Sequence, residues 1–377
     1  MAPRDVTVGA PGNVTPPFDN VIKAAQRNEQ QGYDAIWWYD HLMSWWPQSI
    51  WTPDLVPPAK LQANPHIHLD TIATIGAVGV QTERVMLGTS VTDAVRRSPA
   101  MLAQEFLTLD HITKGRVILG IGTGEACNAT PYGIEYGTKP VSRMEEAIKI
   151  IRLLWKSDEP VDFEGQFWKL EGAIIALPPY RPGRYPPIWI GGVAPRTLRV
   201  LGQLADGWLP VNMPLDEYKQ RMALIRQSAS DAGRDPDAIT YSLWGYVVID
   251  DSHEECHRML DALLVKDLCL ALPWDVFKRH GYTHPLGERA FGMVDYVPSR
   301  ISRERALGLI QAVPFEVTHE FILHGTPEDL AEYFEPYIAA GVKHIALQNI
   351  TFAADERKLT SSFRLMAQLV KYIKGLA

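Results

Sequence analysis

The stretch GIGTGEACN, residues 120–128, combines alternating glycines with a carboxylic acid directly after an apolar run. A dinucleotide-binding turn of the G-x-G-x-x-G type needs a third glycine where this chain has Glu125, and then a helix, which Pro131 and Gly133 disfavour. The spacing instead favours a strand end kept bare so that a flat ligand can approach the backbone. Glu125 could exchange a proton with that ligand, although a loop glutamate that only caps a turn also fits the pattern.

Asp40 and His41 stand in a comparable position, directly after another apolar run at 35–38. A histidine can serve as general acid or general base near neutral pH because its pKa lies in that range. A structural, hydrogen-bonded histidine is the alternative that the sequence leaves open.

Three tryptophans, Trp45, Trp46 and Trp51, follow this pair in a segment that also contains several prolines. A loop facing solvent does not normally carry so much apolar surface. We expect the segment either to line or cover a pocket, or to pack against another insertion or a second subunit.

The run at 188–190 leads through Gly191, Gly192, Val193, Ala194 and Pro195 into a helical pattern. Backbone N–H groups at the start of a helix attract anions, so this loop is a candidate phosphate site, with a plain tight turn as the alternative.

Other chemistries find little support in the sequence. The pairs His66-x-His68 and His280-x3-His284 have no third ligand near them in the sequence, so no metal site is predicted. The chain contains no G-x-x-x-x-G-K-[ST] phosphate loop and no G-x-S-x-G elbow, which argues against P-loop and serine hydrolase functions.

Eight short apolar runs must position these residues, and most are followed by a turn and a helical pattern. They lie at 6–9, 35–38, 85–91, 117–120, 188–190, 207–210, 241–248 and 344–347. This alternation predicts a parallel sheet, and eight units predict a closed (β/α)8 TIM barrel in a single domain, 1–377. A doubly wound open sheet is the structural alternative.

The length of 377 residues exceeds the roughly 250 that such a barrel needs. We place the excess in insertions near 42–68, 125–187 and 253–318. The first two follow the second and fourth strands directly, so they are expected at the C-terminal face, where barrels of this kind carry their sites.

A net charge of −7 without longer basic runs argues against a nucleic-acid partner. No apolar run approaches the roughly 20 residues that a membrane span needs, and the first twelve residues do not resemble a signal peptide. Three cysteines without CxxC spacing fit a reducing cytoplasm. A small molecule is therefore the expected partner.

Four stretches together resemble the luciferase-like superfamily, and more narrowly its branch that uses the deazaflavin coenzyme F420. They are YDHLMSWWP (39–47), LGTSVTDAVRRSPAMLAQEFLTLD (87–110), GRVILGIGTGEACN (115–128) and IWIGGVAPRTLRVLGQLADGW (188–208). The resemblance covers most of the chain. It implies a (β/α)8 barrel that holds F420 at the C-terminal ends of the strands, and a homodimer, which is common in this family.

The resemblance also assigns site residues. It implies that His41, Glu125 and Trp45 are catalytic, with Glu125 as the proton donor to the deazaflavin and Trp45 near its ring. The positions that it implies for cofactor binding include a step, Ser90-Val91, at which the family has a cis peptide, and the loop that holds the cofactor phosphate. These positions are Asp40, Ser90, Val91, Gly122, Thr123, Asn128, Gly191, Gly192, Val193, Ala194 and Arg196.

One departure bears on the substrate. The sugar-phosphate dehydrogenase of this branch carries a lysine shortly after the sixth strand, where this chain has Val211, Asn212, Met213 and Pro214. We therefore expect an apolar or bulky ketone or secondary alcohol rather than an anionic sugar ester. The alternatives are an FMN-dependent monooxygenase of the same superfamily and a deazaflavin-binding protein without turnover.

Overall fold

The computed structural model describes residues 5–375, and its centre is a closed barrel of eight parallel strands. The strands are β1 (Thr7–Pro11), β2 (Ala35–Trp38), β3 (Met86–Thr89), β5 (Val117–Gly122), β8 (Ile188–Ile190), β9 (Gly207–Trp208), β10 (Thr240–Ile249) and β12 (His344–Asn349). The barrel closes because β10 pairs with β9 on one side and with β12 on the other. All eight predicted strands are confirmed, and the open-sheet alternative is wrong.

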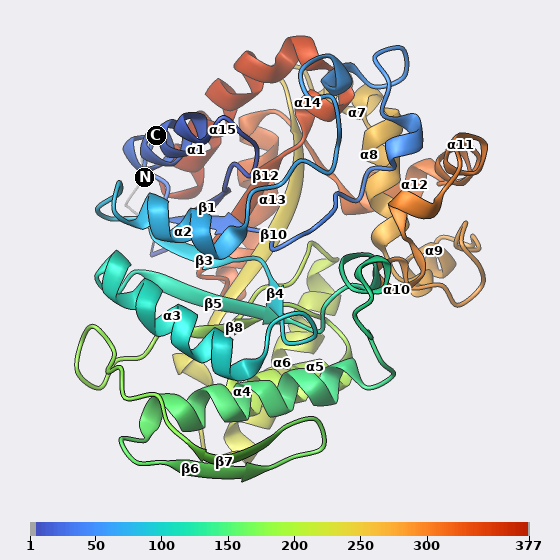
Figure 1. Ribbon diagram of the computed structural model, residues 1–377. Helices are drawn as coiled ribbons and strands as arrows, with labels where there is room; N and C mark the ends of the chain where they lie inside the picture. Colours follow the sequence, from blue (N-terminus) through green and yellow to red (C-terminus); the bar gives the residue numbers. More distant parts are fainter. Residues whose placement is uncertain (1–4, 376–377) are drawn as a thin grey trace.

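Helices surround the barrel as the alternation predicts (Figure 1). They are α1 (Phe18–Gln30), α2 (Thr71–Gly79), α3 (Pro99–Thr113), α4 (Pro140–Lys156), α5 (Pro195–Leu204), α6 (Leu215–Asp231), α13 (Pro327–Ala339) and α15 (Leu359–Ile373). Side-chain caps mark the start of α3 and α13. Ser98 caps α3 through a bond from Met101 N, and Thr326 with Asp329 forms a capping box on α13. Within residues 5–375, no helix has the length and apolar character that crossing a membrane requires.

Large side chains fill the inside of the barrel. Trp37, Trp189 and Trp244 form a buried cluster there with Ile118 and Leu209. A second and larger core lies between the strands and the surrounding helices, and it contains alternate residues of the same strands. Side chains thus fill the interior of the barrel, and a reaction site is expected only at the strand ends.

The segments beyond the barrel contribute shorter elements. Between 42 and 68 lie η1 (Gln48–Ile50) and η2 (Pro57–Lys60), and between 125 and 187 lie η3 (Ala126–Asn128), η4 (Thr130–Tyr132) and a hairpin of β6 (Val161–Glu164) and β7 (Lys169–Ala173). After β10 come α7 (His253–Met259), α8 (Leu263–Leu268), α9 (Trp274–Arg279), α10 (Gly292–Asp295), α11 (Arg303–Gln311), α12 (Phe315–Phe321) and β11 (Leu323–Gly325). The remaining elements are β4 (Thr92–Asp93), α14 (Thr351–Ala354), η5 (Pro236–Ala238), η6 (Cys269–Ala271), η7 (Pro298–Arg300) and η8 (Glu356–Lys358).

Two of these segments share a core of their own. Ile50, Trp51 and Val56 are buried against residues of α8 and α11, and Trp46 stacks on Trp51 with ring centroids 5.5 Å apart. Figure 1 shows α8, α9, α11 and α12 together on one side of the barrel, next to the segment at 42–68. The packing alternative is therefore correct for Trp46 and Trp51.

Candidate active site

His41 and Glu125 meet at the C-terminal ends of β2 and β5. His41 Nε2 lies 3.2 Å from Glu125 Oε2, and the two side chains are only 11% and 18% exposed. Each residue comes three positions after the last residue of its strand. The barrel closure brings the strand ends together, so two residues that are 84 positions apart in the sequence form one acid–base pair.

Glu125 is held in its charged form. Burial alone would raise the pKa of this carboxyl, but the charge of His41 and the hydrogen bonds from His41 and Asn128 outweigh burial and lower the pKa. Asn128 Nδ2 donates to Glu125 Oε2 at 2.9 Å. The carboxylate therefore accepts from three side chains, those of His41, Asn128 and, at 3.7 Å, the Cys127 thiol.

Asn128 also fixes the loop that follows His41. Its Oδ1 accepts hydrogen bonds from the backbone N–H of Leu42 at 2.7 Å and of Met43 at 3.2 Å. Because one amide side chain contacts both Glu125 and the backbone after His41, it sets the distance between the two loops. Its role as a cofactor contact stays a prediction, and within the protein it links the two loops.

Asp40 precedes His41 in the chain, and donors of the protein occupy its carboxylate. Its carboxylate accepts from Thr92 Oγ1 at 2.6 Å and from Arg97 Nε at 3.1 Å, and Arg96 lies 3.1 Å away. Burial alone would raise the pKa of Asp40, but the two arginines lower it. Arg96 also binds Asp93 at 2.6 Å. Asp40 thus anchors the loop that carries His41, and the arginine pair is not part of a basic surface.

Aromatic rings surround the pair. The ring centroid of Tyr39 lies 4.9 Å from that of His41, and Trp45 meets His41 edge-on at 6.3 Å. Tyr296 stacks on Trp45 with an interplanar angle of 4° and centroids 6.4 Å apart. Of the three tryptophans of the insertion, Trp45 alone has a ring contact with His41. Trp45 also packs against the core of the insertions, and its lining of a pocket stays a prediction.

Sequence reasoning missed Tyr246. Burial raises the pKa of its hydroxyl, and the nearby charge of Glu125 raises it further, which places this side chain at the pair. Its ring packs on Phe321, with centroids 5.5 Å apart. The alternation of side chains along β10 could have predicted it. Residues two apart in a strand point to the same side, so Tyr246 points into the barrel as Trp244 does.

The glycines of β5 differ from the prediction. A Cβ at Gly120 would stand 1.8 Å from the carbonyl oxygen of Thr89, and a Cβ at Gly122 would stand 2.7 Å from Val91 Cγ2. The missing side chains therefore make room for the protein's own atoms rather than for an open cleft. The idea that they expose backbone to a flat ligand is wrong for these two positions. Thr123, the next residue, is half-buried.

The side chain of Val91 packs against Gly122 and Gly191, so three of the predicted cofactor positions lie together. Its side chain lies over Gly122, and its Cγ1 would be 3.1 Å from a Cβ at Gly191. The Ser90-Val91 peptide is cis, as the family resemblance predicts. Ser90 Oγ is buried without a hydrogen-bond partner in the protein. This hydroxyl at the end of β3 is an unused donor close to the strand ends.

The loop from Gly191 to Arg196 connects β8 to α5. Gly192 adopts φ +144, and its carbonyl accepts from Trp208 Nε1 at 2.9 Å. Val193 is half-buried, Ala194 is the N-cap of α5, and Pro195 is its first residue. Arg196 is exposed and lies 3.4 Å from Glu145. A glycine turn leading into the first turn of a helix is the geometry that binds phosphate.

Comparisons with known proteins agree with this arrangement. The model of the luciferase-like monooxygenase family matches residues 3–344. A phthiodiolone/phenolphthiodiolone dimycocerosates ketoreductase of Mycobacterium sp. (strain JLS) is 37% identical over 353 residues, covering 91% of each chain. An F420-dependent glucose-6-phosphate dehydrogenase of Microbacterium testaceum (strain StLB037) is 34% identical over 216 residues, 56% of this chain and 58% of that protein.

The fold has solved counterparts as well. An F420-dependent secondary alcohol dehydrogenase in complex with an F420–acetone adduct superposes with a TM-score of 0.74. The superposition covers 98% of this chain and 99% of that one, at 21% identity. The expected resemblance is confirmed by a family model and by a ketoreductase relative that each cover most of the sequence. The chain belongs to the luciferase-like monooxygenase family and is an oxidoreductase.

Proposed function

We propose that this oxidoreductase uses coenzyme F420 to interconvert a ketone and a secondary alcohol on a fairly apolar or bulky substrate. The observation that carries the proposal is the 3.2 Å contact between His41 and Glu125 at the strand ends. The ketoreductase and dehydrogenase relatives support the reaction type.

The residues at the strand ends fit a flat redox cofactor. Ser90 Oγ has no protein partner, and Tyr246 and Trp45 provide aromatic surface beside Glu125 and His41. The first turn of α5 leaves backbone N–H groups for a phosphate, and Gly191 and Gly192 precede it. When bound, the deazaflavin would supply or accept a hydride at its C5 atom.

The protein's own task is then proton management. In the reducing direction His41 would donate a proton to the substrate oxygen, which gains negative charge as the carbonyl carbon is reduced. Glu125 would take up at its carboxylate the proton that the deazaflavin ring releases when it gives up the hydride, and in the oxidising direction both roles reverse. Trp45 would exclude water from the reacting atoms, and Asn128 would hold the two loops in register.

The surroundings of β9 support an apolar substrate. Asn212 accepts from Tyr333 Oη at 2.7 Å and donates to the carbonyl of Glu320, so its amide is engaged within the protein. Met213 is buried and Val211 packs into the core of the insertions. None of residues 211–214 is a cation, and Arg221, which lies 3.4 Å from Met213 Sδ, is paired with Glu217.

Binding titrations separate the cofactor alternatives. We expect saturable binding of F420 and much weaker binding of FMN, each followed by fluorescence. Micromolar binding of FMN without binding of F420 would instead support a monooxygenase that depends on a reductase partner and oxygen. Bound F420 without turnover of any ketone, alcohol or sugar would favour a deazaflavin-binding protein.

Substitutions test the assigned roles. We expect His41→Ala and Glu125→Gln each to lower kcat with reduced F420 by about 10²- to 10⁴-fold, the usual contribution of a positioned acid or base. His111→Ala and Glu164→Gln are matched controls, because His111 contacts Pro178 O and the Glu164 side chain is 80% exposed on the β6–β7 hairpin. Near-normal turnover in both active-site variants would contradict the roles.

A further inference from the structure

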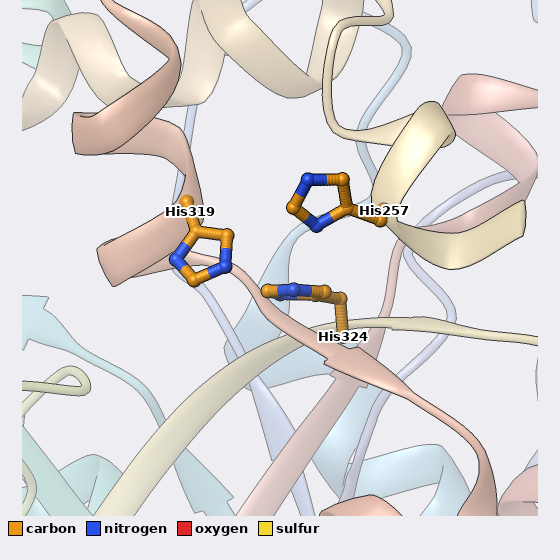
Figure 2. Close-up of side chains that lie close together, drawn as sticks. All are labelled: His257, His319 and His324. Carbon is orange, nitrogen blue, oxygen red and sulfur yellow. The ribbon is translucent and has the colours of Figure 1, made fainter. Parts of the chain in front are cut away.

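Three histidines from separate elements gather on the insertion side of the barrel, apart from the His41–Glu125 pair. His257 lies on α7, His319 on α12 and His324 on β11 (Figure 2). One ring nitrogen of each lies within 4.8 Å of the others. We call this group the histidine triad. The triad could not be predicted from the sequence, because its three residues become neighbours only in the fold.

The rings face one another closely. The centroids of His319 and His324 are 4.7 Å apart, those of His257 and His319 are 5.3 Å apart, and those of His257 and His324 are 5.7 Å apart. Nitrogen ligands of a tetrahedral zinc ion lie about 3.4 Å from one another when each Zn–N bond is about 2.0–2.1 Å. Small side-chain rotations of the two exposed rings would close the triad to that spacing.

His324 is already prepared as a ligand. Its Nδ1 lies 2.9 Å from the carbonyl oxygen of Ile322. A carbonyl can only accept, so Nδ1 carries the proton and Nε2 keeps its lone pair. Metal-binding histidines characteristically donate their second N–H to a carbonyl or a carboxylate in this way.

Neighbouring residues hold the three elements together. The Cys256 thiol donates to the carbonyl of Gly325 at 3.4 Å, which fixes α7 on β11. Phe315 packs against both His257 and His319 and forms one wall of the group. His253 is paired with Asp329 at 2.9 Å, so it stands beside the triad with its own partner.

We propose that the histidine triad binds one divalent transition metal ion of the zinc class, with a fourth position open to solvent. Three imidazoles suit Zn²⁺, Cu²⁺ or Ni²⁺, whereas Mg²⁺ and Ca²⁺ prefer oxygen ligands. The ion would link α7 and α12 to β11 and so attach the segment after β10 to the barrel wall. This site is independent of the proposed F420 chemistry.

The test uses the full-length chain without a histidine tag, stripped with a chelator and titrated calorimetrically with ZnCl₂. We expect one Zn²⁺ per chain and a higher unfolding temperature in its presence, with no effect of MgCl₂. His257→Ala and His319→Ala should each weaken Zn²⁺ binding at least about tenfold. His111→Ala, an exposed histidine outside the triad, should bind as the unaltered chain does.

Two results would overturn the proposal. One is the absence of saturable Zn²⁺ binding, and the other is unchanged affinity in the double variant His257→Ala/His319→Ala. Should a variant fail to fold, Co²⁺ added to the unaltered chain still decides. Histidine-bound Co²⁺ absorbs visible light, and this absorption should be strong and removed by EDTA, whereas a spectrum equal to that of free Co²⁺ contradicts the site.

Discussion

At the scale of single residues, Asp267 on α8 is a carboxyl group enclosed by the core of the insertions. Its Oδ1 accepts from Tyr296 Oη at 2.7 Å, and its Oδ2 is buried without a partner. Burial raises the pKa of Asp267 to about 8 despite the hydrogen bond from Tyr296. Because Tyr296 stacks on Trp45, this buried acid supports the aromatic wall beside His41.

The raised pKa has a defined consequence for stability. In the folded chain Asp267 keeps its proton up to about pH 8, whereas in the unfolded chain it loses the proton near pH 4. The stabilisation of the folded chain that comes from this raised pKa is complete below pH 4. It decreases by about 1.4 kcal/mol per pH unit as the pH rises towards 8. Asp267→Asn should remove this decrease.

Urea unfolding at several pH values between 5 and 8 measures the effect. The free energy of unfolding of the Asn variant minus that of the unaltered chain should increase steadily as the pH rises from 5 to 8. Asp251→Asn is the control, because Asp251 is exposed and pairs only with Arg364 at the surface. A pH-independent difference for Asp267→Asn would show that this carboxyl is charged in the folded chain.

The residues that could be predicted from the sequence are those directly after strands. His41 and Glu125 were predicted from their position after apolar runs, and the structure places them in contact. Tyr246 and Asp267 were not predicted. Tyr246 lies within a strand, where its direction depends on the parity of the barrel interior, and the environment of Asp267 is built by segments distant in the sequence.

At the scale of elements, the parallel strands could be predicted because each is a short apolar run followed by turn and helix signals. The elements within the insertions could not. The helices from α7 to α12 have only four to nine residues, too short for a clear apolar period. The antiparallel β6–β7 pair has mostly exposed and half-buried residues, so it also lacks an apolar run.

The contact of β3 with β5 leads to a prediction about Gly120. An alanine there would place a Cβ 1.8 Å from the Thr89 carbonyl, a backbone atom that cannot move without disturbing the barrel. Gly120→Ala should lower the free energy of unfolding by about 3 kcal/mol, the upper end of the usual cost of overpacking, because the clash is with backbone. Thermal and urea unfolding measure this loss.

Gly308→Ala is the matched control. Gly308 lies within α11, and a Cβ there meets no atom within 4 Å. Alanine is favoured over glycine in a helix by about 0.5–1 kcal/mol, so this variant should be unchanged or more stable. Equal stability of the two variants would mean that β3 and β5 do not approach as closely as described.

At the scale of the whole molecule, the segment at 42–68 and the segment after β10 form one core above the barrel. Trp51 is 5% exposed, stacks on Trp46 and donates to the carbonyl of Gln62 at 2.6 Å. This packing holds the segment that also carries Trp45. The position of Trp45 beside His41 therefore depends on contacts made outside the barrel.

Trp51→Ala tests this dependence. Removing a buried tryptophan should cost about 3–5 kcal/mol of unfolding free energy and should raise KM for the substrate, because the support of Trp45 is loosened. Leu61→Ala in the same segment is the control, since Leu61 is 77% exposed. A Trp51→Ala variant with unaltered stability would contradict the shared core.

The most direct measurement of the central claim follows the hydride itself. Reduced F420 carrying deuterium at C5 is incubated with the protein and an apolar ketone, and the product is analysed by mass spectrometry. We expect a secondary alcohol with deuterium on the carbinol carbon, formed at a rate that falls strongly in His41→Ala. An oxygenated product that requires reduced FMN and oxygen, with no deuterated alcohol from F420, would contradict hydride transfer from F420.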